Sequence, residues 1–271
     1  MAVHSYKGGT GKTLISANLA TLLAAEGKKT CLLDMDFLAP SLHALFKIDL
    51  PDSWVNDYMN GACKPERILK SVRFNGLEKD KLFVGFANPS TEAIREMSAK
   101  DRKWEMQALA RLLSLQSSLF DGLSFDHLIF DTSPGLQYSS INAVIASDIA
   151  LVVASSAASD LEGTWQMLHD LYEIFGKKTA LLFNKVLPGM LQSEKVKRLQ
   201  SGVGLPKLIF SSSITCSCYI PLYENPCFYA CEKQNSPFSR ALNNIASVIS
   251  THQSRLASPK ITLASCEGLR I

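Results

Sequence analysis

The sequence has 271 residues, of which 46% are hydrophobic and 20% charged, and its formal net charge at pH 7 is +3. This composition is typical of a globular protein and excludes a largely disordered or collagen-like chain. The net charge is too small to indicate a nucleic-acid or anionic-membrane partner, although a local basic patch would be hidden in a balanced total.

A strand, a glycine-rich loop and a helix are predicted in that order at the start of the chain. Residues 2–6 are partly apolar and run into Gly-rich sequence, which is typical of a buried strand that ends in a loop. Residues 12–26 predict a helix, because apolar residues recur at helical spacing and Gly27 occupies a favourable C-cap position. The recurring apolar residues are Ile15, Leu19, Leu22 and Leu23.

Short apolar runs further along the chain predict parallel core strands, with a helix at residues 161–175 between the last two. Strands that alternate with helices predict right-handed βαβ units. The predicted fold class is therefore α/β, with a doubly wound, mostly parallel sheet and helices on both faces. The runs lie at residues 31–33, 82–84, 127–130, 149–153 and 179–183, and residues 207–210 are a further candidate strand.

The remaining segments give less regular patterns. Residues 92–119 predict an amphipathic helix, whereas residues 51–81 show only fragments of a pattern. No Pro/Ser-rich linker divides the chain, so we expect a single domain over residues 1–255 and a flexible tail over residues 256–271. The longest apolar stretch, residues 143–158, is shorter than the roughly 20 residues of a membrane-spanning helix.

A seven-residue segment between the first predicted strand and helix matches a phosphate-binding loop. Its glycines let successive backbone N–H groups converge on phosphate oxygens, and the helix N-terminus adds its dipole. In P-loop enzymes this spacing places the lysine, here Lys12, on the β- and γ-phosphates and the hydroxyl, here of Thr13, in the magnesium shell. The alternative is an ordinary Gly/Lys loop. The segment is Lys7-Gly8-Gly9-Thr10-Gly11-Lys12-Thr13.

On these residues the sequence resembles the MinD/ParA family, whose deviant Walker A motif carries an additional lysine near its start, matched by Lys7. The resemblance implies a P-loop ATPase that binds ATP and Mg²⁺. It also implies an ATP-dependent homodimer in which Lys7 reaches the partner's nucleotide. Tyr6 departs from the general P-loop pattern by occupying its first glycine position, which puts in doubt how tightly the loop closes. The resemblance covers about residues 1–48 and 120–250.

Two acidic segments extend the resemblance. Leu33-Asp34-Met35-Asp36 is similar to the family's switch I, which implies that Asp36 orients the attacking water and that carboxylates here help to hold hydrated Mg²⁺. The alternative is a pair of acidic residues that cap a strand end. With Lys7 and Lys12, Asp36 forms the expected catalytic set.

The second acidic segment, Asp131-Thr132-Ser133-Pro134-Gly135, resembles the family's Walker B and switch II stretch, which is usually written with two prolines where this chain has Ser133-Pro134. An acidic residue at the carboxyl edge of a parallel strand lies where ligands bind in open α/β sheets. We therefore expect Asp131 to hold Mg²⁺ through water, together with Thr13 and Asp36, although Asp131 could instead cap the next helix.

Two later residues are candidates for contact with the base. Asn184 ends a predicted strand, at a position where the family's asparagine presents its side-chain amide to adenine. Asn also favours turns after strands, so a purely structural role is the alternative. Pro221 lies in a Tyr-Ile-Pro segment that matches the family's Ile-Pro pair near the base.

Four of the seven cysteines fall within sixteen residues, at Cys216, Cys218, Cys227 and Cys231. A thiol cluster of this kind suggests a second metal site, with zinc or an iron-sulfur cluster, although the first pair departs from the usual spacing of structural zinc ligands. The alternative is that these cysteines are small buried core residues.

The predicted function is a slow, dimeric ATP-dependent switch that controls the binding of an unidentified protein partner in positioning or partitioning. The alternatives are a metallocentre-maturation ATPase that uses the cysteines and a nucleotide-dependent scaffold without significant hydrolysis. Residues 254–271 show no basic amphipathic helix, so we expect no direct membrane binding, and nucleic-acid binding stays open. The phosphate loop begins at residue 7, so we expect no signal peptide and a cytoplasmic location.

Overall fold

The computed structural model describes residues 1–271 except 50, 75, 187–191, 202–207, 216–228 and 254–271. Within the described residues, eight strands form one sheet in the order β3-β4-β2-β5-β1-β6-β7-β8. All pairs are parallel except β3 with β4, which is antiparallel. The strands are β1 Ala2–His4, β2 Thr30–Met35, β3 Lys70–Val72, β4 Leu82–Gly85, β5 His127–Thr132, β6 Ile149–Ser155, β7 Lys178–Val186 and β8 Leu208–Thr215.

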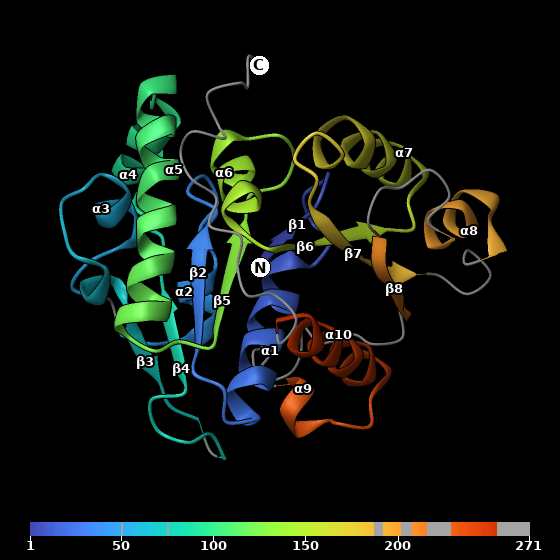
Figure 1. Ribbon diagram of the computed structural model, residues 1–271, viewed down its shortest axis with the longest axis horizontal. Helices are drawn as coiled ribbons and strands as arrows, with labels where there is room; N and C mark the ends of the chain where they lie inside the picture. The colour runs from blue at the N-terminus through green and yellow to red at the C-terminus, as the bar shows by residue number, and fades with distance from the viewer. Residues whose placement is uncertain (50, 75, 187–191, 202–207, 216–228, 254–271) are drawn as a thin grey trace.

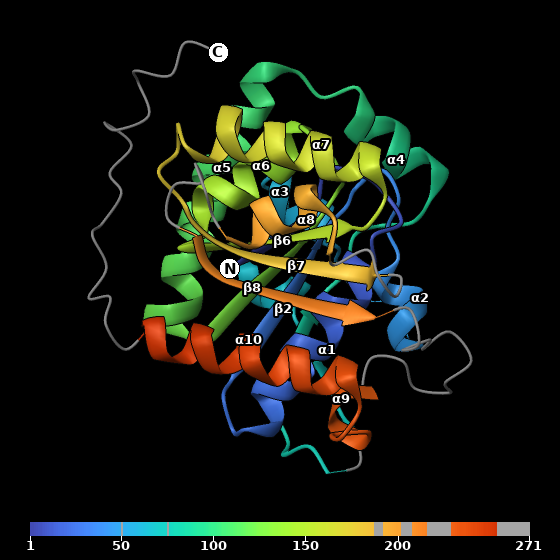
Figure 2. The same ribbon diagram turned by 90° about the vertical axis from the view of Figure 1, so that its right-hand side faces the viewer.

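Helices cover both faces of this sheet, which confirms the predicted doubly wound α/β fold. Figure 2 shows α1 and α10 on one face and α5, α6 and α7 on the other. The helices are α1 Lys12–Ala25, α2 Leu42–Phe46, α3 Val55–Met59, α4 Thr91–Ser98, α5 Arg102–Ser117, α6 Tyr138–Ala146, α7 Ala158–Met167, α8 Glu194–Gln200, α9 Tyr229–Glu232 and α10 Pro237–Gln253, with a 3₁₀-helix at Pro65–Ile68 and π-helical turns at Ser118–Gly122 and Leu168–Tyr172.

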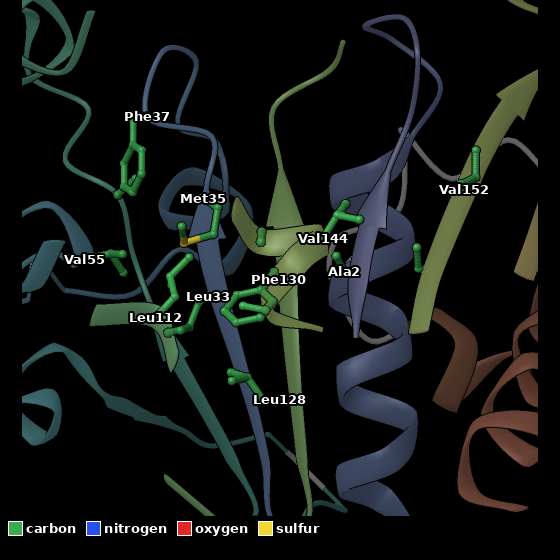
Figure 3. Packing of buried hydrophobic residues seen from close by; sticks show 14 of the residues in the cluster. Ala2, Leu33, Met35, Phe37, Val55, Leu112, Leu128, Phe130, Val144 and Val152 are labelled. Carbon is green, nitrogen blue, oxygen red and sulfur yellow. The ribbon is translucent and has the colours of Figure 1, made fainter. Parts of the chain in front are cut away.

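The central strands are apolar on both faces because each face is covered by helices. Figure 3 shows Leu33 and Met35 of β2 and Phe130 of β5 packed near Leu112 of α5 and Val144 of α6. Each of these side chains is fully buried. Burial of one such side chain contributes about 1.5–3 kcal/mol to folding, so the centre of the sheet is a rigid base for the loops at its carboxyl edge.

The helix predicted at residues 92–119 is wrong as a single element, because α4 and α5 are separate helices (Figure 1). The side chain of Asp101 accepts a hydrogen bond from the backbone N–H of Trp104 and so caps a new helix. Caps of this kind favour a helix start within an otherwise helical pattern. The helix predicted at residues 161–175 begins earlier, at Ala158, and changes to a π-helical turn from Leu168.

Two strand predictions also need correction. The first strand ends at His4 rather than at residue 6, so Ser5 and Tyr6 already belong to the phosphate loop. The antiparallel edge strand β3 lies in the segment that showed only fragments of a pattern. The candidate strand at residues 207–210 is confirmed from Leu208 onward and extends to Thr215. In the part of the chain that the structure describes, no helix has the length and hydropathy needed to cross a membrane.

Candidate nucleotide site at the carboxyl edge of the sheet

The loop between β1 and α1 presents a helix N-terminus without a side-chain cap. Gly11 is the N-cap residue of α1, it makes no capping hydrogen bond through a side chain, and the first turn contains no acidic residue. The first backbone N–H groups of a helix lack intrahelical partners, and they carry the positive end of the helix dipole. This end of α1 is therefore suited to bind an anion such as phosphate.

Gly11 is required at this position for two reasons. Its φ of +95° lies in the left-handed region, which side chains disfavour. A Cβ on Gly11 would also lie 2.5 Å from the side-chain nitrogen of Asn184, which is closer than real Cβ contacts. The sequence motif and the tertiary packing therefore demand the same residue.

A cavity of about 800 Å³ opens above this loop. Its size falls within the range of small-molecule sites. Three segments that lie far apart in the sequence line it: the phosphate loop, the segment after β2 and the segment after β5. The lining residues include Gly8, Gly9, Gly11, Lys12 and Thr13 from the first, Asp36, Leu38 and Ala39 from the second, and Pro134 and Gln137 from the third.

Lys12 lies at the floor of this cavity, with 7% of the residue exposed. Its Nζ donates a hydrogen bond of 2.9 Å to the hydroxyl of Ser5. Burial lowers the pKa of the ammonium group, and the nearby carboxylates of Asp131 and Asp36 oppose this shift. The structure thus holds a poorly hydrated cation beside the uncapped helix end, an arrangement that suits a polyphosphate.

Asp131 is the group that best fits a magnesium site. Its Oδ1 accepts a hydrogen bond of 2.9 Å from the hydroxyl of Ser16, whereas its Oδ2 is buried and has no hydrogen-bond partner among the described residues. Burial raises the pKa of the carboxyl to about 6, although hydrogen bonds from Thr13 and Ser16 oppose this. A hydrated cation near Thr13 and Asp131 would compensate the orphaned oxygen, and hard oxygen ligands are those that Mg²⁺ prefers.

Asp36 lines the cavity and directly follows the carboxyl end of β2. Its Oδ1 accepts hydrogen bonds from the backbone N–H of Ala39 at 3.1 Å and from the hydroxyl of Ser133 at 2.8 Å. The side chain is partly exposed toward the cavity. This placement matches the position of the predicted water-orienting residue, and the role itself stays a prediction.

Asp34 holds the segment that carries Asp36. Its Oδ1 accepts a hydrogen bond of 3.0 Å from the backbone N–H of Asp36, and its Oδ2 accepts one of 3.3 Å from the N–H of Leu42. The carboxyl is 1% exposed, and burial, followed by the charge of Asp131, raises its pKa well above the usual range. Asp34 therefore holds the backbone of the loop after β2 in place at Asp36 and Leu42.

Asn184 lies against the phosphate loop. Its side-chain amide donates a hydrogen bond of 2.7 Å to the carbonyl oxygen of Thr10, and Nζ of the adjacent Lys185 donates one of 2.7 Å to the carbonyl oxygen of Gly9. The contact with Thr10 gives Asn184 a structural role, which the sequence analysis had left open as the alternative. Its predicted contact with the base stays a prediction, and Pro221 lies outside the described residues.

Lys7 is exposed at the rim of the site. Its Nζ donates a hydrogen bond of 2.7 Å to the hydroxyl of Ser159, which is also exposed. The unusual Tyr6 packs against α7, where a Cβ on Gly163 would lie 1.9 Å from the tyrosine ring. The absence of a side chain at Gly163 thus accommodates the tyrosine that replaces the first glycine of the general P-loop pattern.

The structure gives the predicted second metal site no support. Cys216, Cys218 and Cys227 lie outside the described residues, and Cys231 lies on α9 as a free, partly buried thiol. Burial raises the pKa of the Cys231 thiol to about 11, so it stays protonated at neutral pH. Within the described ranges no group of three or more His, Cys, Asp or Glu side chains is placed to hold a metal ion.

Sequence reasoning missed three hydroxyl groups at this site. Ser5 contacts Lys12, Ser16 contacts Asp131, and Ser133 contacts Asp36. Ser16 lies one helical turn after Lys12, so its place on the same face of α1 offered a signal. Ser133 offered another, because it replaces a proline of the family pattern. The contact of Ser5 depends on the fold of the loop.

A family model described as an AAA domain matches residues 1–183. The septum site-determining protein MinD of Thermotoga maritima is 28% identical over 196 residues, which cover 71% of this chain and 66% of that protein. The chain spans between 54% and 66% of the length of the curated relatives that it matches first.

Solved structures share the fold. MinD of Pyrococcus horikoshii complexed with Mg-ADP is 21% identical, with a TM-score of 0.68 over 92% of this chain and 94% of that chain. The MinC:MinD complex of Aquifex aeolicus includes a chain that is 19% identical, with a TM-score of 0.70 over 96% of this chain and 97% of that one. At these identities the likeness establishes the fold.

Proposed function

Because the chain belongs to the MinD/ParA-type family of P-loop ATPases, we propose that it is an ATP-binding, slowly ATP-hydrolysing switch that works as a homodimer and controls the binding of a protein partner. The observation that carries the proposal is the single cavity that joins the uncapped N-terminus of α1, the Lys12 ammonium group and the segments after β2 and β5. The Mg-ADP complex of the similar MinD structure supports the choice of ligand.

Binding would use groups that the fold already holds in place. The backbone N–H groups of the phosphate loop and the N-terminus of α1 bind the phosphates, and Lys12 exchanges its bond to Ser5 for phosphate oxygens. Thr13 and Asp131 would hold Mg²⁺, which neutralises charge on the β- and γ-phosphates. The buried orphan oxygen of Asp131 supports this assignment.

Hydrolysis would depend on Asp36. Phosphoryl transfer requires mainly positioning and charge stabilisation, and Lys12 and the loop N–H groups supply the charge stabilisation. Asp36 lies on the cavity wall with one carboxylate oxygen held by Ala39 and Ser133. Its other oxygen would accept a hydrogen bond from the attacking water and orient it.

Dimerisation would depend on Lys7. The lysine is exposed, and its contact in the monomer is with the exposed hydroxyl of Ser159. A surface contact of this kind contributes little to stability, so releasing it costs about 1 kcal/mol or less. Lys7 can therefore leave Ser159 and reach the nucleotide of a second copy when that copy presents its phosphates. Loss of the γ-phosphate would reopen the dimer and release the segments after β2 and β5, and with them the partner.

The proposal is tested by sedimentation of the purified chain with ATP and Mg²⁺, with ADP and Mg²⁺, and without nucleotide. Of the three conditions, we expect only ATP with Mg²⁺ to give a dimer of the wild type. The Asp36→Ala dimer should persist with ATP and Mg²⁺, because it does not hydrolyse ATP. The Lys7→Ala protein should bind ATP but stay monomeric. Lys28→Ala is the matched control, because Lys28 is exposed in the segment between the C-terminal end of α1 and β2. A Lys7→Ala protein that dimerises like the wild type would contradict the proposed switch, and so would a wild type that binds no ATP.

A further inference from the structure

The segments after β2 and β5 leave the sheet side by side. The two strands are parallel neighbours, and their register pairs Asp34 with Asp131 and Met35 with Thr132. The residue that directly follows β2 is Asp36, and the residue that directly follows β5 is Ser133. Strand pairing thus brings these two residues together at the cavity, although 97 positions separate them in the sequence.

The Ser133 hydroxyl donates a hydrogen bond of 2.8 Å to Oδ1 of Asp36. Ser133 is 0% exposed, whereas Asp36 is partly exposed and lines the cavity. A hydrogen bond to a charged acceptor is roughly twice as strong as one between neutral groups. Since the donor is shielded from water, water competes poorly for this contact.

This bond restricts the orientation of the carboxylate. Oδ1 accepts from both Ser133 and the backbone N–H of Ala39, while Oδ2 has no hydrogen-bond donor among the described residues. Two donors on one oxygen fix the rotation of the carboxylate group. Oδ2 is then left to accept a hydrogen bond from a water molecule in the cavity.

Ser133 is itself held in place. Its carbonyl oxygen accepts a hydrogen bond of 2.8 Å from the hydroxyl of Ser140 in α6. The hydroxyl that contacts Asp36 therefore extends from a fixed backbone. A proline at this position, as the family pattern usually has, carries no side-chain donor and could not make the bond.

We propose that Ser133 is a positioning residue that orients Asp36 for water activation and ties the segment after β2 to the segment after β5. The inference rests on the proposed role of Asp36. Ser133 need not contact nucleotide or water, because it acts through the carboxylate. Its loss would therefore lower the rate of hydrolysis and leave nucleotide binding intact.

Single-turnover hydrolysis of ATP with Mg²⁺ tests the proposal, with nucleotide affinity measured separately using a fluorescent ATP analogue. We expect Ser133→Ala to lower the hydrolysis rate about tenfold, the effect of losing one charge-assisted hydrogen bond. The affinity should stay within about twofold of the wild type. Ser133→Cys, which keeps the size but donates weakly, should lower the rate similarly and serves if the alanine variant folds poorly.

Ser147→Ala is the matched control, because it removes a buried hydroxyl at the C-terminal end of α6, where that hydroxyl donates to the carbonyl oxygen of Val144 and contacts neither Ser133 nor Asp36. We expect its hydrolysis rate to stay near that of the wild type. In an Asp36→Ala background, Ser133→Ala should cause no further loss, since the group that it positions is gone.

The proposal for Ser133 is overturned if Ser133→Ala hydrolyses ATP at the wild-type rate while Asp36→Ala does not. It is also overturned if Ser147→Ala is equally slow, or if Ser133→Ala causes the same loss with and without Asp36. An Asp36→Ala protein that hydrolyses ATP at the wild-type rate would instead refute the role of Asp36, and the inference would fall with it.

Discussion

The side-chain amide of Asn184 donates a hydrogen bond of 2.7 Å to the carbonyl oxygen of Thr10, so the end of β7 supports the phosphate loop from the side. A Cβ on Gly11 would lie 2.5 Å from the same side-chain nitrogen. The predicted phosphate loop is thus in contact with a residue that lies more than 170 positions away in the sequence. This contact gives a prediction that separates a structural role of Asn184 from a role in base recognition.

We predict that Asn184→Ala weakens the binding of ATP and GTP by a similar factor of about ten, because the phosphate loop loses a buried hydrogen bond. Asn184→Asp should weaken both further, since a carboxylate repels the carbonyl oxygen of Thr10. Calorimetric titration with each nucleotide measures the effect. A loss confined to ATP would show that the amide reads the base and that its contact with Thr10 is secondary.

The second prediction concerns Asp131. Its pKa is raised to about 6 by burial, so the charged form destabilises the metal-free fold as the pH rises from about 4, and the cost is complete above about 6. Asp131→Asn should therefore raise the free energy of unfolding of the metal-free protein by about 1–2 kcal/mol near pH 7.5, and the gain should shrink below pH 6. Urea denaturation at several pH values measures it.

The same variant should lose the stabilisation that Mg²⁺ with ADP gives to the wild type, because the proposed metal ligand is gone. Thermal unfolding with ADP, with and without Mg²⁺, provides this readout. A variant that is less stable without metal, or one that still responds to Mg²⁺, would contradict the assignment of the orphaned oxygen.

The third prediction concerns the buried imidazole of His4. Its Nδ1 accepts from the hydroxyl of Tyr172 and its Nε2 donates to the carbonyl oxygen of Gly135, each at 2.7 Å, which satisfies the neutral ring. Burial lowers the pKa of His4 to about 4 despite the opposing effect of the Gly135 carbonyl. The unfolded state therefore binds a proton first as the pH falls.

Stability should accordingly be unaffected by His4 above about pH 6.5 and should fall by about 3 kcal/mol as the pH drops toward 4. His127, whose pKa burial also lowers to about 4, contributes in the same window. An NMR titration that follows the ring nitrogens measures the pKa of His4 and that of His127 separately. The signal that is missing in His4→Gln belongs to His4. A His4 ring that titrates near pH 6.5 in the folded protein would refute the prediction.

The fourth prediction concerns Gly163 and Tyr6. A Cβ at Gly163 would lie 1.9 Å from the tyrosine ring, so Gly163→Ala should cost about 1–3 kcal/mol of stability through overpacking. In a Tyr6→Ala background the cost should fall below about 1 kcal/mol, because the clash is removed. Gly122→Ala is the control, since nothing lies within 4 Å of its added Cβ. If Gly163→Ala lowered the free energy of unfolding equally with and without Tyr6→Ala, the tyrosine ring would not be the reason for a glycine at position 163.

The local features of this protein are encoded in short stretches of its amino-acid sequence. The order of strands and helices follows from apolar periodicity, and the loop from Lys7 to Thr13 is a contiguous motif whose chemistry depends on neighbouring residues. The expected roles of Asp36 and Asp131 rest on the resemblance of their segments to switch I and Walker B, and their positions at the ends of apolar strands agree with it, because ligands bind at that edge of open α/β sheets. These signals are encoded within a few residues.

Which side chains support those residues depends on how distant segments pack together in the fold. Ser133 contacts Asp36 because β2 and β5 are neighbours in register, and Asn184 contacts Thr10 because β7 ends beside the phosphate loop. The edge strand β3 likewise exists through its pairing with β4, and its own sequence shows little strand pattern. Strand order and register are long-range properties, so short sequence patterns do not encode these contacts.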